Sequence, residues 1–490
     1  MGVAGILMPI ASLPSPYGIG DFGKEAFDFV DRLASVGVKL WQILPLQPLG
    51  YGNSPYQPYS SYAGETLYIS PKFMYIDGLV TREEIEELEG KSCKNGNPER
   101  IAYKTVRQEK EFLFRKAFTR FIKTEDYNNF AKNSWVYSYG LFVALKQKNK
   151  GSCWNTWPTE ERQWPSNRSY DETKLIEEIE YQTFLQYVFF KQWRELKTYA
   201  NGKGISIMGD MPFYVGLDSQ DVWENQKSFL LDEQANPSFV AGVPPDYFCA
   251  TGQRWGNPIY DWKYLEETGY EFWINRLVSS SEMFDIIRLD HFRAFDTYWK
   301  IPASCETAMV GEWMEAPGYD FFRTLYENHP EIALVVEDLG LLRPEVNKLR
   351  DTFKFPGMRV LQFTFLEDRD NWEHYKERNV ITYTGTHDND TTLGWYTSQS
   401  KGNKKVISKK LKRLGIKRKS ISWAFIECCF RTGADMAIVP VQDVIEKSTS
   451  SRINTPGTVG SPNWEWRLTS FKSWDRFAPK LKAVIKLTNR

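Results

Sequence analysis

Two charged residues stand two positions apart at the end of an apolar run in residues 284–293. Two isoleucines open the run, and Arg288 and Asp290 follow them. Because residues i and i+2 of a strand share a face, we expect the guanidinium group and the carboxylate to point the same way. A buried charge is costly unless it is paired. The pattern therefore fits a structural ion pair, and it equally fits a nucleophilic carboxylate that its arginine neighbour keeps ionised.

Carboxylates at the ends of other predicted strands favour the interpretation of Asp290 as a nucleophile. Glu337 ends the apolar run of residues 333–337, and Asp388 follows the run of residues 380–383. In a barrel of parallel strands, all carboxyl ends converge on one face, where active sites lie. We therefore expect Asp290, Glu337 and Asp388 to meet in one pocket, although they are far apart in the chain.

Two carboxyl groups that flank one bond are the equipment of glycoside chemistry. One must be ionised to attack the anomeric carbon, and we expect Arg288 to keep Asp290 in that form. The other must carry a proton for the departing oxygen. The apolar neighbours of Glu337, together with nearby acids, should raise its pKa and suit it to this role.

Further polar residues accompany these acids. His291 and His387 are two of only four histidines in the chain, and both are suitable donors to sugar hydroxyls. Asp388 could accept hydrogen bonds from two hydroxyls of a distorted ring. Asp338 should point away from Glu337 on its strand, and Asp390 should stabilise its own loop, so we leave both out of the site.

Short apolar runs alternate with helical patterns along the chain and predict a parallel sheet covered by helices. Eight such runs predict a (β/α)8 TIM barrel. A first helix is expected over residues 24–35, with Gly37 as its C-terminal cap. The predicted strands are residues 5–10, 39–44, 205–210, 286–290, 333–337, 359–363, 380–383 and 437–441.

The spacing of these strands predicts one elaborated barrel over residues 1–490 with large, mostly helical insertions on its C-terminal face. Residues 45–204 exceed an ordinary connection and should form a helical insertion, with helices near residues 99–130 and 175–200. Residues 211–285 form a second insertion. Its Gly- and Pro-punctuated segment, residues 242–258, has the composition of a lid.

Composition excludes several classes of protein. The chain has 62 basic and 62 acidic residues, which gives no general attraction to nucleic acid or to anionic membranes. The basic run of residues 401–419 is interpreted as a solvated outer helix. Six cysteines form no CxxC, no metal-ligand spacing is present, and no apolar stretch is long enough to span a membrane. The N-terminus lacks a basic signal-peptide region, so we expect a cytoplasmic protein.

Aromatic residues make up 15% of the chain, including 18 tryptophans, and many stand in polar loops rich in Gly and Pro. Flat aromatic faces with polar surroundings suit ring ligands such as sugars. A competing motif is GxGxxG at residues 18–23, which is typical of dinucleotide binding. The next predicted strand carries no acid for a ribose, so this interpretation remains only as an alternative, a nucleotide-dependent oxidoreductase.

Nine stretches in sequence order resemble the 4-α-glucanotransferases, also called amylomaltases or disproportionating enzymes, of the α-amylase superfamily. They extend over nearly the whole chain, and the GxGxxG string begins within the first of them, so the resemblance explains it as a loop of this family. They are residues 12–21 (SLPSPYGIGD), 52–57 (GNSPYQ), 209–212 (GDMP), 242–248 (GVPPDYF), 252–258 (GQRWGNP), 288–293 (RLDHFR), 337–340 (EDLG), 385–389 (GTHDN) and 454–457 (NTPG).

The resemblance implies a role for each matching residue. Asp290 would be the nucleophile, Glu337 the acid/base and Asp388 the stabiliser of the transition state. The substrate-binding residues would be Tyr56, which stacks on the sugar, Asp210, Arg288, His291 and His387 around the same subsite, Trp255 in the lid, and Asn454 on the glucan. Cys249 and Ala250 depart from the polar residues expected in the lid.

The implied reaction is the retaining transfer of α-1,4-glucan segments through a covalent glycosyl-enzyme, with maltooligosaccharides as partners and without a metal or organic cofactor. The residues alone do not distinguish transfer from hydrolysis, so an α-glucan hydrolase on the same barrel is the nearest alternative. A non-catalytic glucan-binding protein is a further one, which intact carboxylates at 290 and 337 argue against.

Overall fold

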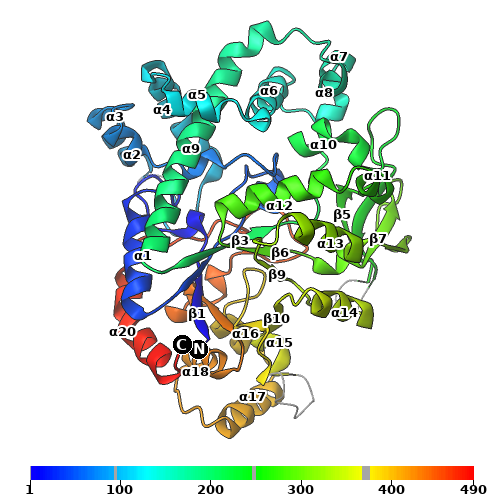
Figure 1. The fold of residues 1–490 in the computed structure, drawn as a ribbon. Helices are drawn as coiled ribbons and strands as arrows, with labels where there is room; N and C mark the ends of the chain where they lie inside the picture. The colour runs from blue at the N-terminus through cyan, green and yellow to red at the C-terminus, as the bar shows by residue number, and fades with distance from the viewer. Residues whose placement is uncertain (1, 93–95, 246–249, 341, 367–375) are drawn as a thin grey trace.

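The computed structural model describes residues 2–92, 96–245, 250–340, 342–366 and 376–490 (Figure 1). Cys249, one of the two departures in the predicted lid, lies outside the described residues. Within the described part of the chain, no helix is both long and apolar enough to cross a membrane.

Eight parallel strands form the barrel, and their order is β10-β11-β12-β1-β2-β3-β6-β9. The ring closes between β9 and β10, because the N–H of Val336 donates to the carbonyl oxygen of Pro356 at 2.9 Å. This closure confirms the predicted (β/α)8 barrel. The strands are β1 (Val3–Leu7), β2 (Leu40–Gln42), β3 (Ser206–Met211), β6 (Ile286–Leu289), β9 (Leu334–Val336), β10 (Gly357–Val360), β11 (Val380–Tyr383) and β12 (Met436–Pro440).

Each predicted strand overlaps one of these strands, but apart from residues 380–383 the predicted bounds differ from the observed ones by up to three residues. Residues 361–363 were expected to extend a strand, but they belong to the short helix α15 (Leu361–Thr364). Ile10 was also expected in a strand and lies in a 3-10 helix (Ile10–Ser12). Both segments remain apolar after the strand has ended, and apolar continuity alone does not mark where an extended backbone turns.

The barrel interior is filled by apolar side chains from successive strands, among them Leu7, Leu40, Met208, Val335 and Ile381. These side chains are almost completely buried. Polar residues then follow on β2, β3 and β6, nearer the carboxyl ends of the strands. The apolar layer therefore forms a dry floor beneath Asp210 and Arg288.

Helices cover the outside of the barrel (Figure 1). α1 (Lys24–Val36) ends as predicted at Gly37, whose φ of 90° is the left-handed conformation of a C-terminal cap. Residues 401–413 of the basic run form α17 (Lys401–Arg413), which buries Ile407 and Leu411 and exposes most of its lysines, as an outer helix should; residues 414–419 of the run lie beyond the helix. The remaining helices of this layer are α12 (Glu271–Met283), α13 (Gly318–Asn328), α14 (Pro344–Thr352), α16 (Thr392–Ser398), α18 (Ile421–Arg431), α19 (Val441–Val444) and α20 (Lys472–Leu487).

Residues 45–204 are largely helical, and Figure 1 shows their helices together at one end of the molecule. The long helix α9 leads from this group back to the barrel, where it packs against α1 and β3. The helices are α2 (Pro71–Ile76), α3 (Arg82–Ser92), α4 (Tyr103–Arg120), α5 (Glu125–Phe130), α6 (Ser134–Lys148), α7 (Thr159–Arg162), α8 (Trp164–Asn167) and α9 (Ile176–Gly202).

A second, four-stranded sheet was not predicted. Its order is β5-β4-β7-β8, and all its pairs are antiparallel. It includes part of the segment expected to be a lid, so the described flanks of that segment form two paired strands. The strands are β4 (Phe239–Val243), β5 (Gln253–Pro258), β7 (Thr297–Pro302) and β8 (Glu312–Glu315), and the helices α10 (Gln220–Glu224) and α11 (Trp262–Glu267) lie nearby in the chain.

Candidate active site

One arginine joins two carboxylates at the ends of β3 and β6. The two strands pair so that Asp210 stands opposite Arg288. Nη1 of Arg288 lies 2.7 and 2.8 Å from the carboxylate oxygens of Asp210 and 3.0 Å from Oδ1 of Asp290. Burial raises the pKa of Asp210, and the guanidinium opposes that rise. Asp290 follows β6 directly, so the strand fixes where its carboxylate stands.

Glu337 follows β9 and lies beside the residue after Asp290. The main-chain N–H of His291 donates to Oε2 of Glu337 at 2.8 Å. Burial raises the pKa of Glu337 to about 8; the charge of Arg288 lowers it and that of Asp290 raises it further. The predicted rise is therefore confirmed, and at neutral pH this carboxyl group carries a proton.

Asp338 and Asp390, the two acids that the sequence analysis left out of the site, lie as expected. Asp338 is buried away from the cavity, where Oδ1 accepts from the N–H of Met358 at 2.6 Å and Oδ2 pairs with Arg350. Asp390 accepts from the N–H of Thr391 and from Oγ1 of Thr449, at 2.7 and 2.8 Å. Both acids hold backbone segments in place, as the sequence predicted for Asp390.

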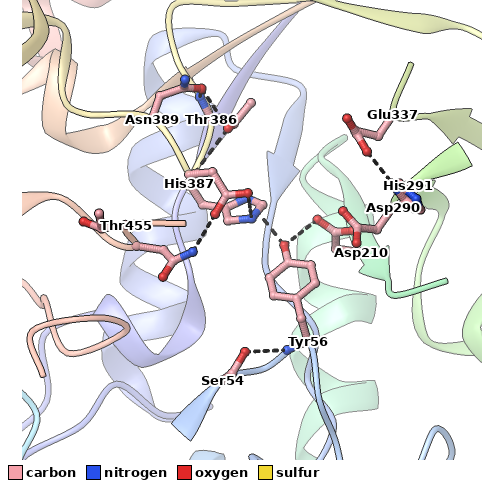
Figure 2. Close-up of polar contacts among 12 residues, drawn as sticks. Ser54, Tyr56, Asp210, Asp290, His291, Glu337, Thr386, His387, Asn389 and Thr455 are labelled. Carbon is pink, nitrogen blue, oxygen red and sulfur yellow. Dashed lines mark hydrogen bonds and ion pairs between the residues drawn. The ribbon is translucent and has the colours of Figure 1, made fainter. Parts of the chain in front are cut away.

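Tyr56 connects two other predicted site residues, Asp210 and His387. Its hydroxyl donates to Oδ2 of Asp210 at 2.9 Å and lies 3.4 Å from Nδ1 of His387. Its ring stacks on the His387 ring, with centroids 5.0 Å apart and planes 16° apart. Figure 2 shows the hydroxyl between Asp210 and His387, with Asp290 and Glu337 beyond.

The loop that carries Tyr56 is held closely by its own backbone and by buried side chains. A methyl group on Gly50 would lie 1.8 Å from the carbonyl oxygen of Gln57, so only glycine fits there. The buried carboxylate of Glu65 accepts from the N–H of Leu49 at 2.8 Å, and Asp221 accepts from the N–H of Ser61 at 2.8 Å. Tyr56 is therefore positioned before any ligand arrives.

Asp388 lies in the loop after β11. Nδ2 of Asn454 donates to its Oδ1 at 2.7 Å, and Nε2 of His387 lies 3.4 Å from its Oδ2. Burial alone would raise the pKa of Asp388, but the His387 charge and the hydrogen bonds from His387 and Asn454 lower it well below its usual range. The pKa of His387 is raised despite its burial, chiefly by Asp388. The pair therefore favours a carboxylate beside an imidazolium.

Arg452 was missed by the sequence analysis. Its Nη2 donates to the main-chain carbonyl of Asp388 and its Nε to that of Asn454, both at 2.6 Å. The same side chain thus connects the loop after β11 to the segment after β12. No sequence motif marked it, because its partners are main-chain carbonyls, which every residue carries.

A cavity of about 620 Å³ lies over these groups. Eight of the ten predicted site residues line it, whereas Asp210 and Arg288 lie beneath and support them. Trp255 belongs to β5, and its ring meets that of His291 edge-on, with centroids 4.9 Å apart. Lining residues that were not predicted include Tyr214, Gln253, Arg254 and Trp464. The excess of loop aromatics was the one signal that could have found the tyrosine and the tryptophan.

The cavity offers aromatic walls, polar donors and two carboxyl groups in different environments. Asp290 is paired with Arg288, and Glu337 is protonated at neutral pH. Among the described residues, no group of three or more His, Cys, Asp and Glu side chains could hold a metal ion. A (β/α)8 barrel with such a pair at its strand ends defines the class of enzymes that cleave glycosidic bonds through two carboxyl groups.

Within this class, the chain belongs to the 4-alpha-glucanotransferase family, whose model matches residues 8–472. It is 40% identical to the 4-alpha-glucanotransferase of Thermus thermophilus, over 99% of this chain and 98% of that protein. It is 38% identical to the chloroplastic/amyloplastic 4-alpha-glucanotransferase of Solanum tuberosum, over 99% and 86% of the two chains.

Solved structures agree. The amylomaltase from Streptococcus agalactiae in complex with acarbose has a TM-score of 0.94 and 34% identity, and each chain covers all of the other. The amylomaltase from Corynebacterium glutamicum, at 17% identity, has a TM-score of 0.81 over all of this chain and 75% of that one, and it supports the fold alone.

Proposed function

We propose that this protein is a retaining 4-α-glucanotransferase that moves segments of an α-1,4-glucan to the 4-hydroxyl of another glucan or of glucose. One observation carries the proposal: Asp290 and Glu337 line the same cavity. His291, the residue after Asp290, links them, because its main-chain N–H donates to the carboxyl group of Glu337. Membership of the family supports the transfer reaction.

In the first step, a carboxylate oxygen of Asp290 attacks the anomeric carbon of the donor glucan. The bond from that carbon to the glycosidic oxygen breaks, and Glu337 gives its proton to the departing oxygen. The product is a glycosyl ester of Asp290 and a shortened glucan with a free hydroxyl. The proton on Glu337 at neutral pH suits this step.

In the second step, the 4-hydroxyl oxygen of the acceptor attacks the same carbon. Its proton passes to Glu337, now a carboxylate, and the ester bond to Asp290 breaks. Two inversions restore the α configuration and both side chains return to their starting forms. Asp388 is proposed to accept hydrogen bonds from ring hydroxyls, which strengthen as the sugar distorts, and Asn454 holds it in place.

Transfer requires that water be kept from the ester while an acceptor is held. The aromatic walls contributed by Tyr56, Trp255 and Trp464 support this, because these rings line the cavity that would hold the glucan and would shield it from water. An α-glucan hydrolase on the same barrel is the alternative. Acarbose in the structure of the Streptococcus agalactiae amylomaltase supports a maltooligosaccharide-like ligand for this cavity. We keep a cytoplasmic location as part of the proposal, although the Solanum tuberosum relative is named chloroplastic/amyloplastic.

The test is incubation of the purified protein with maltotriose, followed by separation of the products over time. We expect glucose together with a ladder of longer maltooligosaccharides, at a constant number of reducing ends. A rising number of reducing ends would identify a hydrolase instead. No product at all would favour a glucan-binding protein.

A second experiment tests the nucleophile. Asp290→Asn should lower the rate by on the order of 10³-fold or more, since the covalent step is lost. Asp351→Asn is the control, because that carboxylate is exposed on α14 and lies outside the cavity. Wild-type turnover by Asp290→Asn would reject the proposed role.

A further inference from the structure

A second hollow, of about 240 Å³, lies on the helical insertion between α5 and α9. It shares no lining residue with the active-site cavity. Figure 1 shows α5 beside α9, and the residues of α9 that line the hollow, 187–194, lie near the middle of that helix. We call it the α5–α9 hollow; its floor is Phe130, Tyr187 and Phe190, and its rim includes Asp126, Asn129 and Arg194.

The aromatic floor is rigid. The Phe130 ring lies 5.9 Å from that of Tyr187 and 5.7 Å from that of Phe190, and Trp135 braces both phenylalanines at 6.0 and 5.6 Å. All three floor residues are only half-buried. The rings therefore present fixed apolar surface to solvent, and a ligand that covers them pays little conformational entropy.

The short helix α5 is held in place as firmly as the rings. Oγ1 of Thr124 caps it by accepting from the N–H of Tyr127 at 3.2 Å, and Tyr127 is buried against Phe121 and Tyr187. Phe130, at the end of the helix, packs in turn on Tyr187 and Phe190 of α9. The hollow is formed by the packing of the insertion itself.

The rim is polar and carries both signs of charge. Asp126, Asn129 and Arg194 are exposed, and in the described part of the chain neither Asp126 nor Arg194 forms an ion pair. Lys191, also at the hollow, is paired with Asp77 at 2.7 Å. Oδ1 of Asn129 accepts from Lys132 at 2.9 Å, which leaves its amide N–H groups to donate. The rim therefore offers an acceptor at Asp126 and donors at Asn129 and Arg194, so an uncharged ligand rich in hydroxyls fits better than an anion.

We propose that the α5–α9 hollow binds a segment of α-1,4-glucan outside the active site. A pyranose ring has an apolar face for the aromatic floor and equatorial hydroxyls for the rim. The active-site cavity uses the same combination, with Tyr56 and Trp255 beside Asn454 and Arg254. This inference rests on the proposed function, because a polymeric substrate is what extends beyond a 620 Å³ cavity.

A chain held at two places binds more tightly than at one, since the second contact is intramolecular. The hollow should therefore strengthen the binding of long glucans and have no influence on short ones. A substitution in the active site would instead affect the turnover of both. A substitution in a purely structural cluster would also affect every substrate.

The experiment compares amylose with maltotriose for Phe130→Ala and Arg194→Ala. An aromatic contact contributes about 0.5–1.5 kcal/mol, so we expect the KM for amylose to rise by about two- to tenfold, with maltotriose kinetics unchanged. Phe112→Ala is the matched control, because that phenylalanine is 56% exposed on α4 and away from the hollow. An unchanged KM for amylose in both variants would overturn the proposal.

Direct binding provides the second measurement. Calorimetry with β-cyclodextrin as the probe, on the wild-type protein saturated with acarbose, should detect a site that Arg194→Ala weakens and Phe112→Ala does not. The cluster would have a structural role only if Phe130→Ala lost activity equally on both substrates and had a lower Tm, and if the wild-type protein bound no cyclodextrin. Failure of the wild-type protein to convert maltotriose would reject the proposed function, whereas the cyclodextrin titration would still test the hollow.

Discussion

The main-chain N–H of His291 donates a hydrogen bond to Oε2 of Glu337, 2.8 Å away. His291 adopts the left-handed conformation, with φ 51° and ψ 46°, which is uncommon for a residue with a side chain. It also directly follows Asp290. The backbone turn that ends β6 therefore positions the proposed acid as well as the proposed nucleophile, so the separation between them does not depend on a flexible side chain alone.

The raised pKa of Glu337 predicts how activity depends on pH. The acid form begins the reaction, and it persists until the pH passes about 8. We expect kcat/KM for maltotriose to stay high at neutral pH and to fall as the pH rises through about 8. The profile should be measured between pH 5 and pH 10. A decline that is already complete below pH 6 would contradict the assignment.

The same shift predicts a pH-dependent effect on stability. The pKa of Glu337 is about 8 in the folded protein against 4.5 for an ordinary glutamate, so between these values the folded state binds more protons than the unfolded state. The free energy of unfolding must therefore decrease as the pH rises across that interval. Glu337→Gln removes the contribution and should raise the Tm more at pH 9 than at pH 5. Glu195→Gln, an exposed change on α9, is the control and should show no such difference.

Arg452 should act as a positioning residue. Arg452→Met removes both hydrogen bonds to the carbonyls of Asp388 and Asn454, and displacement of Asp388 should lower kcat by about 10- to 100-fold with a smaller change in KM. Arg452→Lys, which can keep one of the two bonds, should recover part of the rate. A variant with unchanged kcat but a lower Tm would show that the arginine only stabilises the fold.

Arg288 should be essential for stability. Arg288→Met leaves the buried carboxylate of Asp210 without its partner, which should cost about 3–5 kcal/mol in the free energy of unfolding. The double variant Arg288→Met with Asp210→Asn removes the stranded charge as well and should recover much of that loss. Urea unfolding of the two variants measures the difference. Equal stability of the single and double variants would contradict this account of the pair.

Elements whose pattern lies within one short segment of the sequence were predicted well, and elements that depend on contacts between distant segments were not. The run at Val380–Tyr383 is buried throughout and rich in β-branched residues, and its predicted bounds coincide with β11. Parallel strands buried on both sides have this composition. β5 (Gln253–Pro258) contains a tryptophan, a glycine and a proline, so no apolar run marked it, and its pairing with β4 places it in the antiparallel sheet. That sheet depends on contacts between distant segments, which sequence patterns do not encode.

The site shows the same division. Asp290 and Glu337 could be found because strand ends in a barrel face one direction, whatever their distance in the chain. Only the excess of loop aromatics pointed to Trp464, since it lies in an irregular segment after β12. Its ring lies 5.7 and 6.1 Å from the rings of Tyr56 and His387. The roles proposed for the ten predicted residues remain predictions until the variants are measured.

The pairing of β1 with β12, from Val3 opposite Met436 to Leu7 opposite Pro440, has a consequence for biosynthesis. As the chain leaves the ribosome, the first strand has to wait for almost the whole polypeptide before its second neighbour exists. Until then its edge and the apolar barrel interior stay uncovered, which exposes the nascent chain to aggregation. Asn454 and Arg452 emerge later still, so the nascent chain acquires a complete glucan cavity only at the end of translation.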